Sequence, residues 1–330
     1  MFAALTLAAA LAAADQAAPD VRPEAPPPRE IASGVTLIPG GFLPGRGPDG
    51  NTVIFDAPDG LVVVDTGRHA WHSDAILALA RQRGRPIAAI LNTHWHLDHA
   101  SGNGRLKTAF PNAPLYATNA VDRVLAPGGF LIRNLDGANA ALSDPHAQIG
   151  LLQREEMQIF IDTMAESSAL RPDIVIDRSQ RLRIAGRRLD LRVTDAAVTE
   201  ADLWLYDRRT RIAVLGDLVT LPAPFFETAC PDHWRAALDE VWSTDFRIAI
   251  PGHGEPMTRA QFNTWRTAYA AFIACVASDA EPSACASAWS AGIAEFTAAD
   301  PRAQRMAPQM AEYYVGFLRQ NGGRSPDCAR

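Results

Sequence analysis

The stretch Asn92–His99, Asn-Thr-His-Trp-His-Leu-Asp-His, holds the residues of this chain best suited to chemistry. Three histidines and one aspartate fall within six residues, directly after an apolar run over residues 87–91. That run predicts a buried strand, from whose end several imidazoles can turn inward together. Neutral imidazole and carboxylate are the ligands that zinc and similar metals favour. A polar loop whose histidines cap backbone groups is the alternative, but three of only eight histidines lie here, so we favour a metal site.

The stretch resembles the His-x-His-x-Asp-His signature of the metallo-β-lactamase fold superfamily, which lies at the end of a strand. Three other stretches resemble family motifs in the expected order: Asp65-Thr66-Gly67, Leu215-Gly216-Asp217-Leu218 and Pro251-Gly252-His253-Gly254. The match covers about residues 35 to 255. The resemblance implies an α/β fold, the αββα sandwich of that family, and zinc-dependent hydrolysis.

The resemblance also implies a set of metal ligands for two neighbouring metal ions. It assigns the first metal to His94 and His96 and the second to Asp98, His99 and His253, with Asp217 as a ligand to both.

The family's third histidine for the first metal normally opens a His-Thr-x-Gly-Asp motif. The matching stretch here reads Val198-Thr199-Glu200-Ala201-Asp202, and a valine cannot coordinate a metal. The first pocket therefore falls short of its ligand set, whereas the second keeps enough ligands for a catalytic zinc with an open position. We expect one tightly held zinc in the second pocket and a weak or empty first pocket.

Three other side chains are conceivable replacement ligands, but we expect each to be an ordinary surface group. His69 and His72 follow the turn at Asp65, and Asp195 lies three residues before Val198. The remaining histidines, which we expect at the surface or in a substrate loop, are His146 and His233.

A bound zinc would lower the pKa of its water to about 7 and polarise a substrate carbonyl. Asp98 could orient that water or pass a proton to the leaving group. Asp65 is expected to orient a ligand histidine, although a turn-capping role is nearly as good an interpretation. We therefore predict hydrolysis of a small-molecule amide, lactam, ester or thioester. The alternative, favoured by Val198, is a metal-binding pseudo-enzyme or periplasmic accessory or maturation protein without turnover.

Composition and the N-terminus restrict the partners and the compartment. A net charge of −6 without a long Lys/Arg cluster argues against a nucleic-acid partner. Residues 1–14 are apolar and alanine-rich, and they are shorter than the about twenty residues that span a bilayer. They predict a signal peptide cleaved near Ala14, hence a periplasmic or secreted protein with no membrane span in its mature chain. A buried N-terminal helix is the alternative, since no Lys or Arg precedes the run.

The four cysteines all lie in the last part of the chain, and an even number fits disulfides in an oxidising compartment. Three pairings are possible. Cys275 with Cys285 is the easiest to form, across a short turn, and would leave Cys230 for Cys328. Four unpaired thiols remain the alternative, and the sequence does not decide.

The domain plan places a Pro-rich linker at 15–34, a metallo-β-lactamase-like domain at 35–257 and a helical C-terminal extension at 258–330. An insertion at about 126–172 is mostly helical from 145 to 168, and its apolar stripe is expected to pack in the core. The C-terminal helices could dock a protein partner. Strands are expected at 35–38, 52–56, 61–65, 87–91, 115–116, 174–176, 181–184, 188–193, 202–206, 211–215 and 247–250. Helices are expected at 75–82, in a segment that ends at residue 110, and at 232–242.

Overall fold

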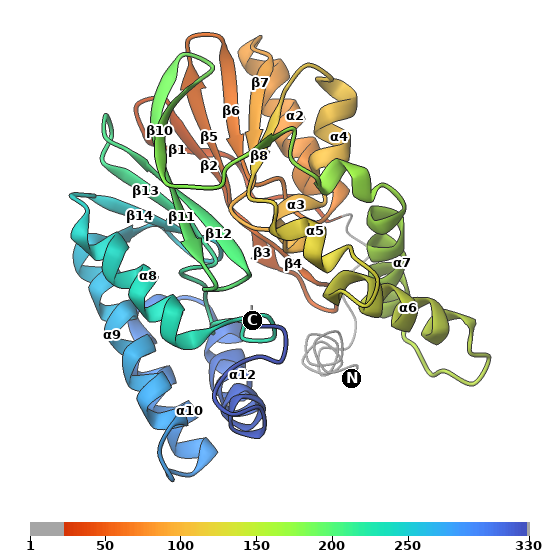
Figure 1. Cartoon of the computed structure of the whole chain (residues 1–330), viewed down its shortest axis with the longest axis vertical. Coiled ribbons are helices and arrows are strands. Elements are labelled where there is room, and N and C mark those ends of the chain that lie inside the picture. The colour runs from red at the N-terminus through yellow and green to blue at the C-terminus, as the bar shows by residue number, and fades with distance from the viewer. Residues whose placement is uncertain (1–22, 329–330) are drawn as a thin grey trace. The chain divides into compact units, whose positions relative to one another are not determined.

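The computed structural model describes residues 23–328 (Figure 1). The predicted signal peptide at 1–14, its cleavage near Ala14 and the first part of the predicted linker lie outside the described residues. The chain forms two compact units. The first comprises the residues up to 177 together with 184–187, and the second comprises the rest.

Seven strands form the sheet of the first unit: β1 (Arg29–Ala32), β2 (Val35–Ile38), β5 (Thr52–Ala57), β6 (Gly60–Val64), β7 (Ile87–Leu91), β8 (Leu115–Ala117) and β9 (Ile174–Val175). Their order in the sheet is β1-β2-β5-β6-β7-β8-β9, and a separate hairpin pairs β3 (Gly41–Phe42) with β4 (Pro48–Asp49). The sheet is parallel from β6 to β9. The carboxyl ends of β6 and β7 therefore lie at the same edge, where Asp65 and the histidine motif follow.

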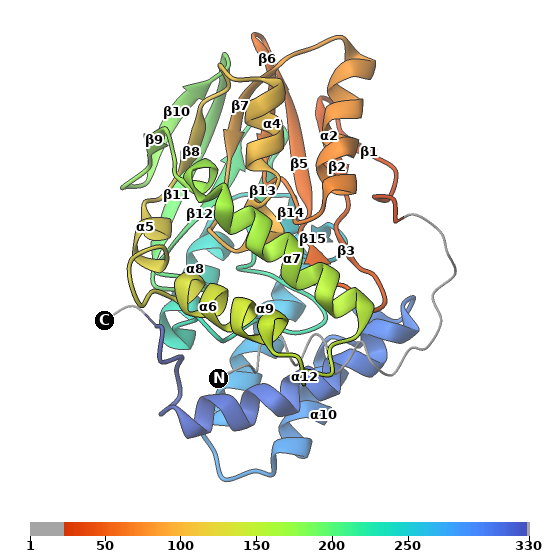
Figure 2. The same cartoon turned by 90° about the vertical axis from the view of Figure 1, so that its right-hand side faces the viewer.

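The helices of the first unit are α2 (Ala70–Arg83), α3 (Leu97–Ala100), α4 (Asn103–Ala109), α5 (Ala120–Val124), α6 (Phe130–Ser143), α7 (Leu151–Ala165) and the 3-10 helix η1 (Ser167–Leu170). Helices α2 and α4 lie on one face of the sheet (Figure 2). Ile54 and Val63 of the sheet pack with Ile76 and Leu79 of α2 in a buried cluster. Burying such side chains contributes about 1.5–3 kcal/mol each, which fixes the strands that carry the motif.

The insertion contains two helices where the sequence predicted one helical segment at 145–168. Helix α6 was missed, and α7 begins only at Leu151. Pro145 explains the break, because a proline disfavours helical backbone in the residue before it, and Asp144 is extended. Met157, Phe160 and Met164 of α7 are buried, as expected for a packing stripe.

Six strands form the sheet of the second unit, in the order β10 (Gln180–Ile184), β11 (Arg187–Asp195), β12 (Ala201–Asp207), β13 (Ile212–Gly216), β14 (Ile248–Pro251) and β15 (Met257–Thr258). Strands β13 and β14 pair in parallel. Its helices are α8 (Pro231–Ser243), α9 (Arg259–Val276), α10 (Pro282–Gly292), α11 (Ala294–Thr297) and α12 (Pro301–Gln320). Trp204 and Leu215 of the sheet share one buried cluster with Trp234 of α8 and Trp265 of α9.

The C-terminal region is helical from Arg259, as predicted, and α10 packs against both α9 and α12. The disulfides join Cys275 to Cys285 and Cys230 to Cys328, with Cα atoms 5.7 and 5.2 Å apart. This is the pairing that the short turn favoured. Within residues 23–328 no helix has the length and apolar character needed to cross a membrane.

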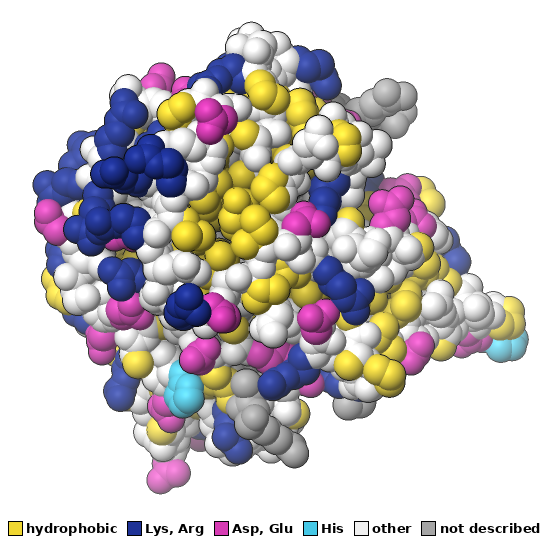
Figure 3. Space-filling view, turned by 45° about the horizontal axis from the view of Figure 1, so that its top comes forward, with side chains coloured by type: hydrophobic (Ala, Val, Ile, Leu, Met, Phe, Trp, Pro, Cys, Tyr) yellow, Lys and Arg dark blue, Asp and Glu magenta, His cyan; other side chains and the backbone are white. Residues whose placement is uncertain are grey.

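Arginines gather on the second unit although the sequence shows no long basic run. Arg181 of β10 and Arg208 after β12 both bind the carboxylate of Asp190, at 2.5 and 2.8 Å. Arg183 and Arg188 are also exposed. Figure 3 shows Lys and Arg side chains along one border of the face that it draws. These arginines are separated in the sequence because they alternate with other residues along the strands. That the chain has no nucleic-acid partner stays a prediction.

Candidate metal centre

The histidine motif begins directly after β7 and continues into the short helix α3. His94, His96 and His99 are all buried, with 3, 7 and 0 % of their surface exposed. The ring of His94 lies 4.5 Å from that of His96 and 4.4 Å from that of His99, centroid to centroid. The first unit therefore brings the three imidazoles of the motif together, as the strand end predicted.

Asp65 fixes the orientation of two of these imidazoles. Its Oδ2 lies 2.8 Å from Nδ1 of His99 and accepts a hydrogen bond from the Thr93 hydroxyl at 2.7 Å. Because that hydroxyl donates its only hydrogen to Asp65, it accepts a hydrogen bond from Nδ1 of His94, 2.9 Å away. Nδ1 carries the proton in both rings, so Nε2 is the atom of each ring with a lone pair for a metal.

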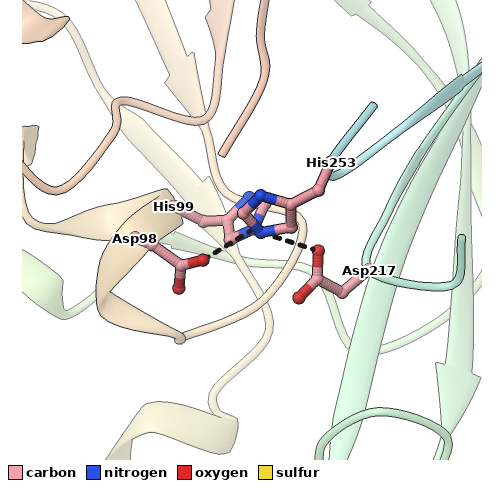
Figure 4. Close-up of side chains that lie close together, drawn as sticks. All are labelled: Asp98, His99, Asp217 and His253. Atoms are coloured by element: carbon pink, nitrogen blue, oxygen red, sulfur yellow. Dashed lines mark ion pairs between the residues drawn. The ribbon is translucent and has the colours of Figure 1, made fainter. Parts of the chain in front are cut away.

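Asp98 and His99 form the donor pair of the first unit (Figure 4). Oδ2 of Asp98 lies 3.7 Å from Nε2 of His99, the ring atom with the lone pair. The side chain of Asp98 is 15 % exposed, whereas that of His99 is fully buried. Asp98 is thus the member of the pair that can reach both a metal and solvent.

Gly50 supports this pair and was missed by the sequence analysis. Its N–H donates to the carbonyl of Asp98 at 2.8 Å. A Cβ atom at Gly50 would lie 2.4 Å from Cε1 of His99, a distance that real Cβ contacts do not show. Only glycine lets the backbone approach the imidazole this closely. A Gly-Asn pair between two turns gave no recognisable signal in a single sequence.

Asp217 and His253 form the donor pair of the second unit (Figure 4). They follow the parallel neighbours β13 and β14, which place both residues at one sheet edge. Oδ1 of Asp217 lies 3.5 Å from Nε2 of His253, and both side chains are buried. A Cβ atom at Gly252 would lie 2.0 Å from Oδ1 of Asp217, so the Pro-Gly-His turn needs its glycine for this approach.

Val198 lies in the turn between β11 and β12 and is buried in the apolar cluster of the second unit. Asp202 shapes the turn, because its Oδ2 accepts the N–H of Val198 at 2.8 Å and its Oδ1 the hydroxyl of Thr199 at 2.8 Å. The side chain of Val198 supplies no donor atom to the turn. Its assignment as the position of a lost ligand stays a prediction.

The expectation that His69 and His72 are surface groups is wrong, since each is only 1 % exposed. Nε2 of His72 lies 2.8 Å from the hydroxyl of Thr52, which itself donates to the Asp65 carbonyl. Burial, opposed by the charge of Asp49, lowers the pKa of His72. A neutral His72 that donates to Thr52 completes the turn beneath Asp65. A single sequence does not reveal that the residues after the Asp65 turn are buried.

The other predicted surface groups lie where they were expected, because Asp195, His146 and His233 are exposed. Sequence reasoning also missed Asn92 and Asn103. The side-chain amide of Asn103 donates to Oδ1 of Asn92 at 2.7 Å, and that of Asn92 donates to the His99 carbonyl at 3.3 Å. The two amides thus join the start of α4 to the end of β7 and to the backbone of the histidine motif.

Among residues 23–328, two groups of side chains could hold a metal ion: Asp98 with His99, Asp217 and His253, and His94 with His96 and Asp217. All the side chains expected as ligands belong to these groups. Imidazole nitrogen with carboxylate oxygen suits zinc, and glycines leave room beside two of the donors. The residues present therefore fit a metal ion.

Comparison with known proteins agrees with this chemistry. A sequence model of the metallo-beta-lactamase superfamily matches residues 45–253. A linear primary-alkylsulfatase from a Pseudomonas species is 29% identical over 234 residues, which are 62% of this chain and 41% of the relative. A hydroxyacylglutathione hydrolase from a Synechococcus species is 46% identical over 56 residues, 17% of this chain and 21% of the relative. The chain spans less than half the length of these curated relatives.

Solved structures support the fold. A metallo-beta-lactamase from Pontibacter korlensis matches 73% of this chain and 95% of its own, with a TM-score of 0.52 and 18% identity. The stereoselective inverting sec-alkylsulfatase Pisa1 from a Pseudomonas species matches 76% of this chain and 42% of its own, with a TM-score of 0.55 and 17% identity. At such identities the likeness concerns the fold alone, and it confirms the predicted α/β fold class.

Proposed function

Because the chain belongs to the metallo-beta-lactamase superfamily, we propose that it is a zinc-dependent hydrolase of a small ester-type substrate. One observation carries the proposal: each unit presents a His–Asp donor pair with a buried imidazole at a sheet edge, and Asp65 orients the imidazole of the pair in the first unit. Superfamily members include hydrolases, as the names of the relatives state.

In the proposed site Asp98, His99, Asp217 and His253 would hold a single zinc. The bound ion would supply a Lewis acid and a water that is acidic at neutral pH. The protein's part is orientation and proton transfer. Asp65 keeps the proton of His99 on Nδ1, 2.8 Å away, so Nε2 stays a donor throughout turnover. Asp98, the more exposed donor, accepts the proton of the attacking water and returns it to the leaving group.

The proposed first pocket has fewer ligands. His94 and His96 are buried and the group that they form includes Asp217, but Val198 supplies no donor where the family motif has histidine. Two imidazoles and a shared carboxylate bind zinc less tightly than three imidazoles with the same carboxylate. We therefore propose that this pocket is weak or empty at zinc concentrations that fill the second.

The substrate class follows from the relatives more than from the site. Their names specify hydrolysis of an alkyl sulfate ester and of an acyl-glutathione. We extend the ester-type substrate to sulfate esters, thioesters and carboxylic esters, with amides and lactams in the same class of attack. The motifs determine the metal chemistry, and the surrounding loops determine which of these is the substrate.

Hydrolysis of a small panel tests the proposal: p-nitrophenyl acetate, p-nitrophenyl sulfate, an acyl-glutathione and a chromogenic lactam, with zinc supplied. We expect turnover of at least one substrate, loss of that turnover in His253→Ala, and its retention in His233→Ala. His233 is exposed on α8 and serves as the matched control within the second unit. Turnover that survives His253→Ala would contradict the proposal.

A metal-binding protein without turnover is the second candidate, and Val198 is the observation that favours it. Its C-terminal helices, α9 to α12, would then be the proposed surface for a protein partner. Full zinc occupancy without hydrolysis across the panel supports this candidate. Hydrolysis that depends on His253 eliminates it.

We also propose export to the periplasm or the medium, with cleavage near Ala14. The two disulfides support an oxidising compartment, because such bonds are rare in reducing ones. Fractionation of expressing cells, with N-terminal sequencing of the mature chain, tests this proposal. A full-length chain retained in the cytoplasm would contradict it.

A further inference from the structure

The imidazole of His69, which is not among the predicted ligands, lies between two buried carboxylates. Its Nδ1 is 2.8 Å from Oδ2 of Asp49, and its Nε2 is 2.9 Å from Oε1 of Glu156. The side chains of the three residues are 1, 7 and 7 % exposed, in that order. Because both ring nitrogens face carboxylates, only the imidazolium, with a proton on each, can donate to both.

The surrounding charges balance this arrangement. Nε of Arg68 lies 3.0 Å from Oε2 of Glu156. Arg46, between β3 and β4, reaches Glu156 at 3.3 Å and Glu155 at 2.7 Å. The other groups around His69 are the indole of Trp71, whose ring stacks on the imidazole with the centroids 3.9 Å apart, and the neutral imidazole of His72 on α2. Three cations thus face three carboxylates in one network, in which Asp49 and Glu156 are buried and Glu155 is 44 % exposed.

Asp49 connects this network to the histidine motif. Its Oδ1 accepts the N–H groups of Arg68 and His69, at 2.7 and 2.9 Å, which caps the start of α2. The next residue is Gly50, which donates to the Asp98 carbonyl at 2.8 Å. A displacement of Asp49 would therefore move the backbone that supports Asp98.

Glu156 connects the same network to the insertion. It lies in the second turn of α7, and its Oε2 also accepts the N–H of Gly47 at 3.1 Å. Thus one carboxylate on α7 holds both the residue before α2 and the hairpin that contains Asp49. Charge-assisted hydrogen bonds of this kind are stronger than hydrogen bonds between neutral groups.

We propose that the His69 imidazolium is a positioning residue that clamps helix α7 of the insertion onto the Asp49–Gly50 segment and thereby seats Asp98. The structural part of this proposal is independent of the proposed function, and only the effect on turnover rests on it. It gives the insertion a role in the site without giving it a ligand.

The proton affinities agree with the clamp. Burial would lower the pKa of His69, but the hydrogen bonds to Asp49 and Glu156 outweigh it and raise the pKa above 6.5. Burial would raise the pKa of Glu156, yet His69 and Arg68 lower it to about 2. The contribution of Glu156 is lost as pH falls from 4.5 toward 2, and that of His69 is lost as pH rises through its raised pKa. The clamp is therefore strongest in mildly acidic solution.

Hydrogen exchange of the full chain tests the clamp independently of any activity. In the wild type we expect the amides of α7 to lose protection as pH rises through the pKa of His69, after correction for the intrinsic exchange rate. In His69→Gln we expect protection of α7 at about pH 6 to fall roughly tenfold or more, with the pH dependence gone. The matched control is Asp162→Asn, an exposed carboxylate on α7 that should leave protection unchanged.

A second variant keeps the test decisive if His69→Gln is poorly folded. In His69→Gln/Glu156→Gln the two amides can donate to one another, so part of the lost protection should return. Protection of α7 that is equal in wild type and His69→Gln, at every pH, would overturn the proposal. So would an additive double variant, because residues in one clamp must be coupled.

The activity measurement separates this inference from the proposed function. If the chain hydrolyses a substrate, His69→Gln should lower kcat more than it raises KM, and the alkaline limb of the pH profile should shift. If no substrate is hydrolysed, the proposed function fails while the exchange result still decides the clamp.

Discussion

Replacing Glu227 with glutamine removes a buried carboxyl that is not among the predicted ligands. Glu227 is 8 % exposed, and the hydroxyl of Tyr313 on α12 donates to its Oε1 at 3.2 Å. Its backbone carbonyl accepts the hydroxyl of Ser325, next to the disulfide that ties Cys230 to Cys328. Glu227 therefore lies where the C-terminal segment is attached to the loop before α8.

The structure determines the sign and size of the expected effect. Burial and the charge of Asp327 raise the pKa of Glu227 from 4.5 to about 7, against the hydrogen bond from Tyr313. The folded state thus holds this proton more tightly than the unfolded state. The resulting stabilisation is complete below pH 4.5 and is lost as pH rises to about 7. A shift of about 2.5 units corresponds to about 3 kcal/mol of unfolding free energy.

Urea unfolding with intact disulfides, at about pH 4.5 and about pH 8, measures this effect. The unfolding free energy of Glu227→Gln minus that of the wild type should rise by about 3 kcal/mol from the lower to the higher pH, because glutamine never ionises. Glu312→Gln is the control, because Glu312 is exposed and precedes Tyr313 on the same helix. A stability difference between Glu227→Gln and wild type that is the same at both pH values would refute the reasoning.

Three further variants test other parts of the account. Gly252→Ala forces a Cβ against Asp217, so zinc affinity should fall at least tenfold while circular dichroism stays native, and unchanged affinity in a zinc titration would contradict the close approach. Val198→His should raise zinc content toward two ions per chain in elemental analysis, and no gain would mean that the lost ligand is misplaced. Replacing Cys230 and Cys328 together with alanine should lower the unfolding free energy by about 2–5 kcal/mol in urea, because the bond closes a long loop, and no loss would indicate that the C-terminal segment is held without it.

The sequence was most informative where a pattern and a ligand type coincided. The apolar run at 87–91 is β7, residue for residue, and the histidines that follow it are buried together. Asp217 and His253 were predicted from the resemblance of their stretches to family motifs, and each follows a short apolar strand. The family resemblance gave the order of these motifs, and local periodicity alone would have left them as separate fragments.

The features that the sequence did not reveal depend on contacts between distant residues. His69 was expected at the surface because it follows a turn, yet Asp49 and Glu156 enclose it from 20 and 87 residues away. Helix α6 was missed because the stretch before it, Pro127-Gly128-Gly129, is typical of a loop. The need for glycine at position 50 appears only when the ring of His99 is in place.

Zinc content is the most direct test of the central claim that distant His–Asp pairs hold one ion. Protein purified with zinc present, then dialysed, should contain about one zinc per chain by elemental analysis. His253→Ala and His99→Ala should each lose most of that zinc, whereas His233→Ala should keep it. If His253→Ala retains as much zinc as the wild type, the two pairs do not share an ion and the account is wrong.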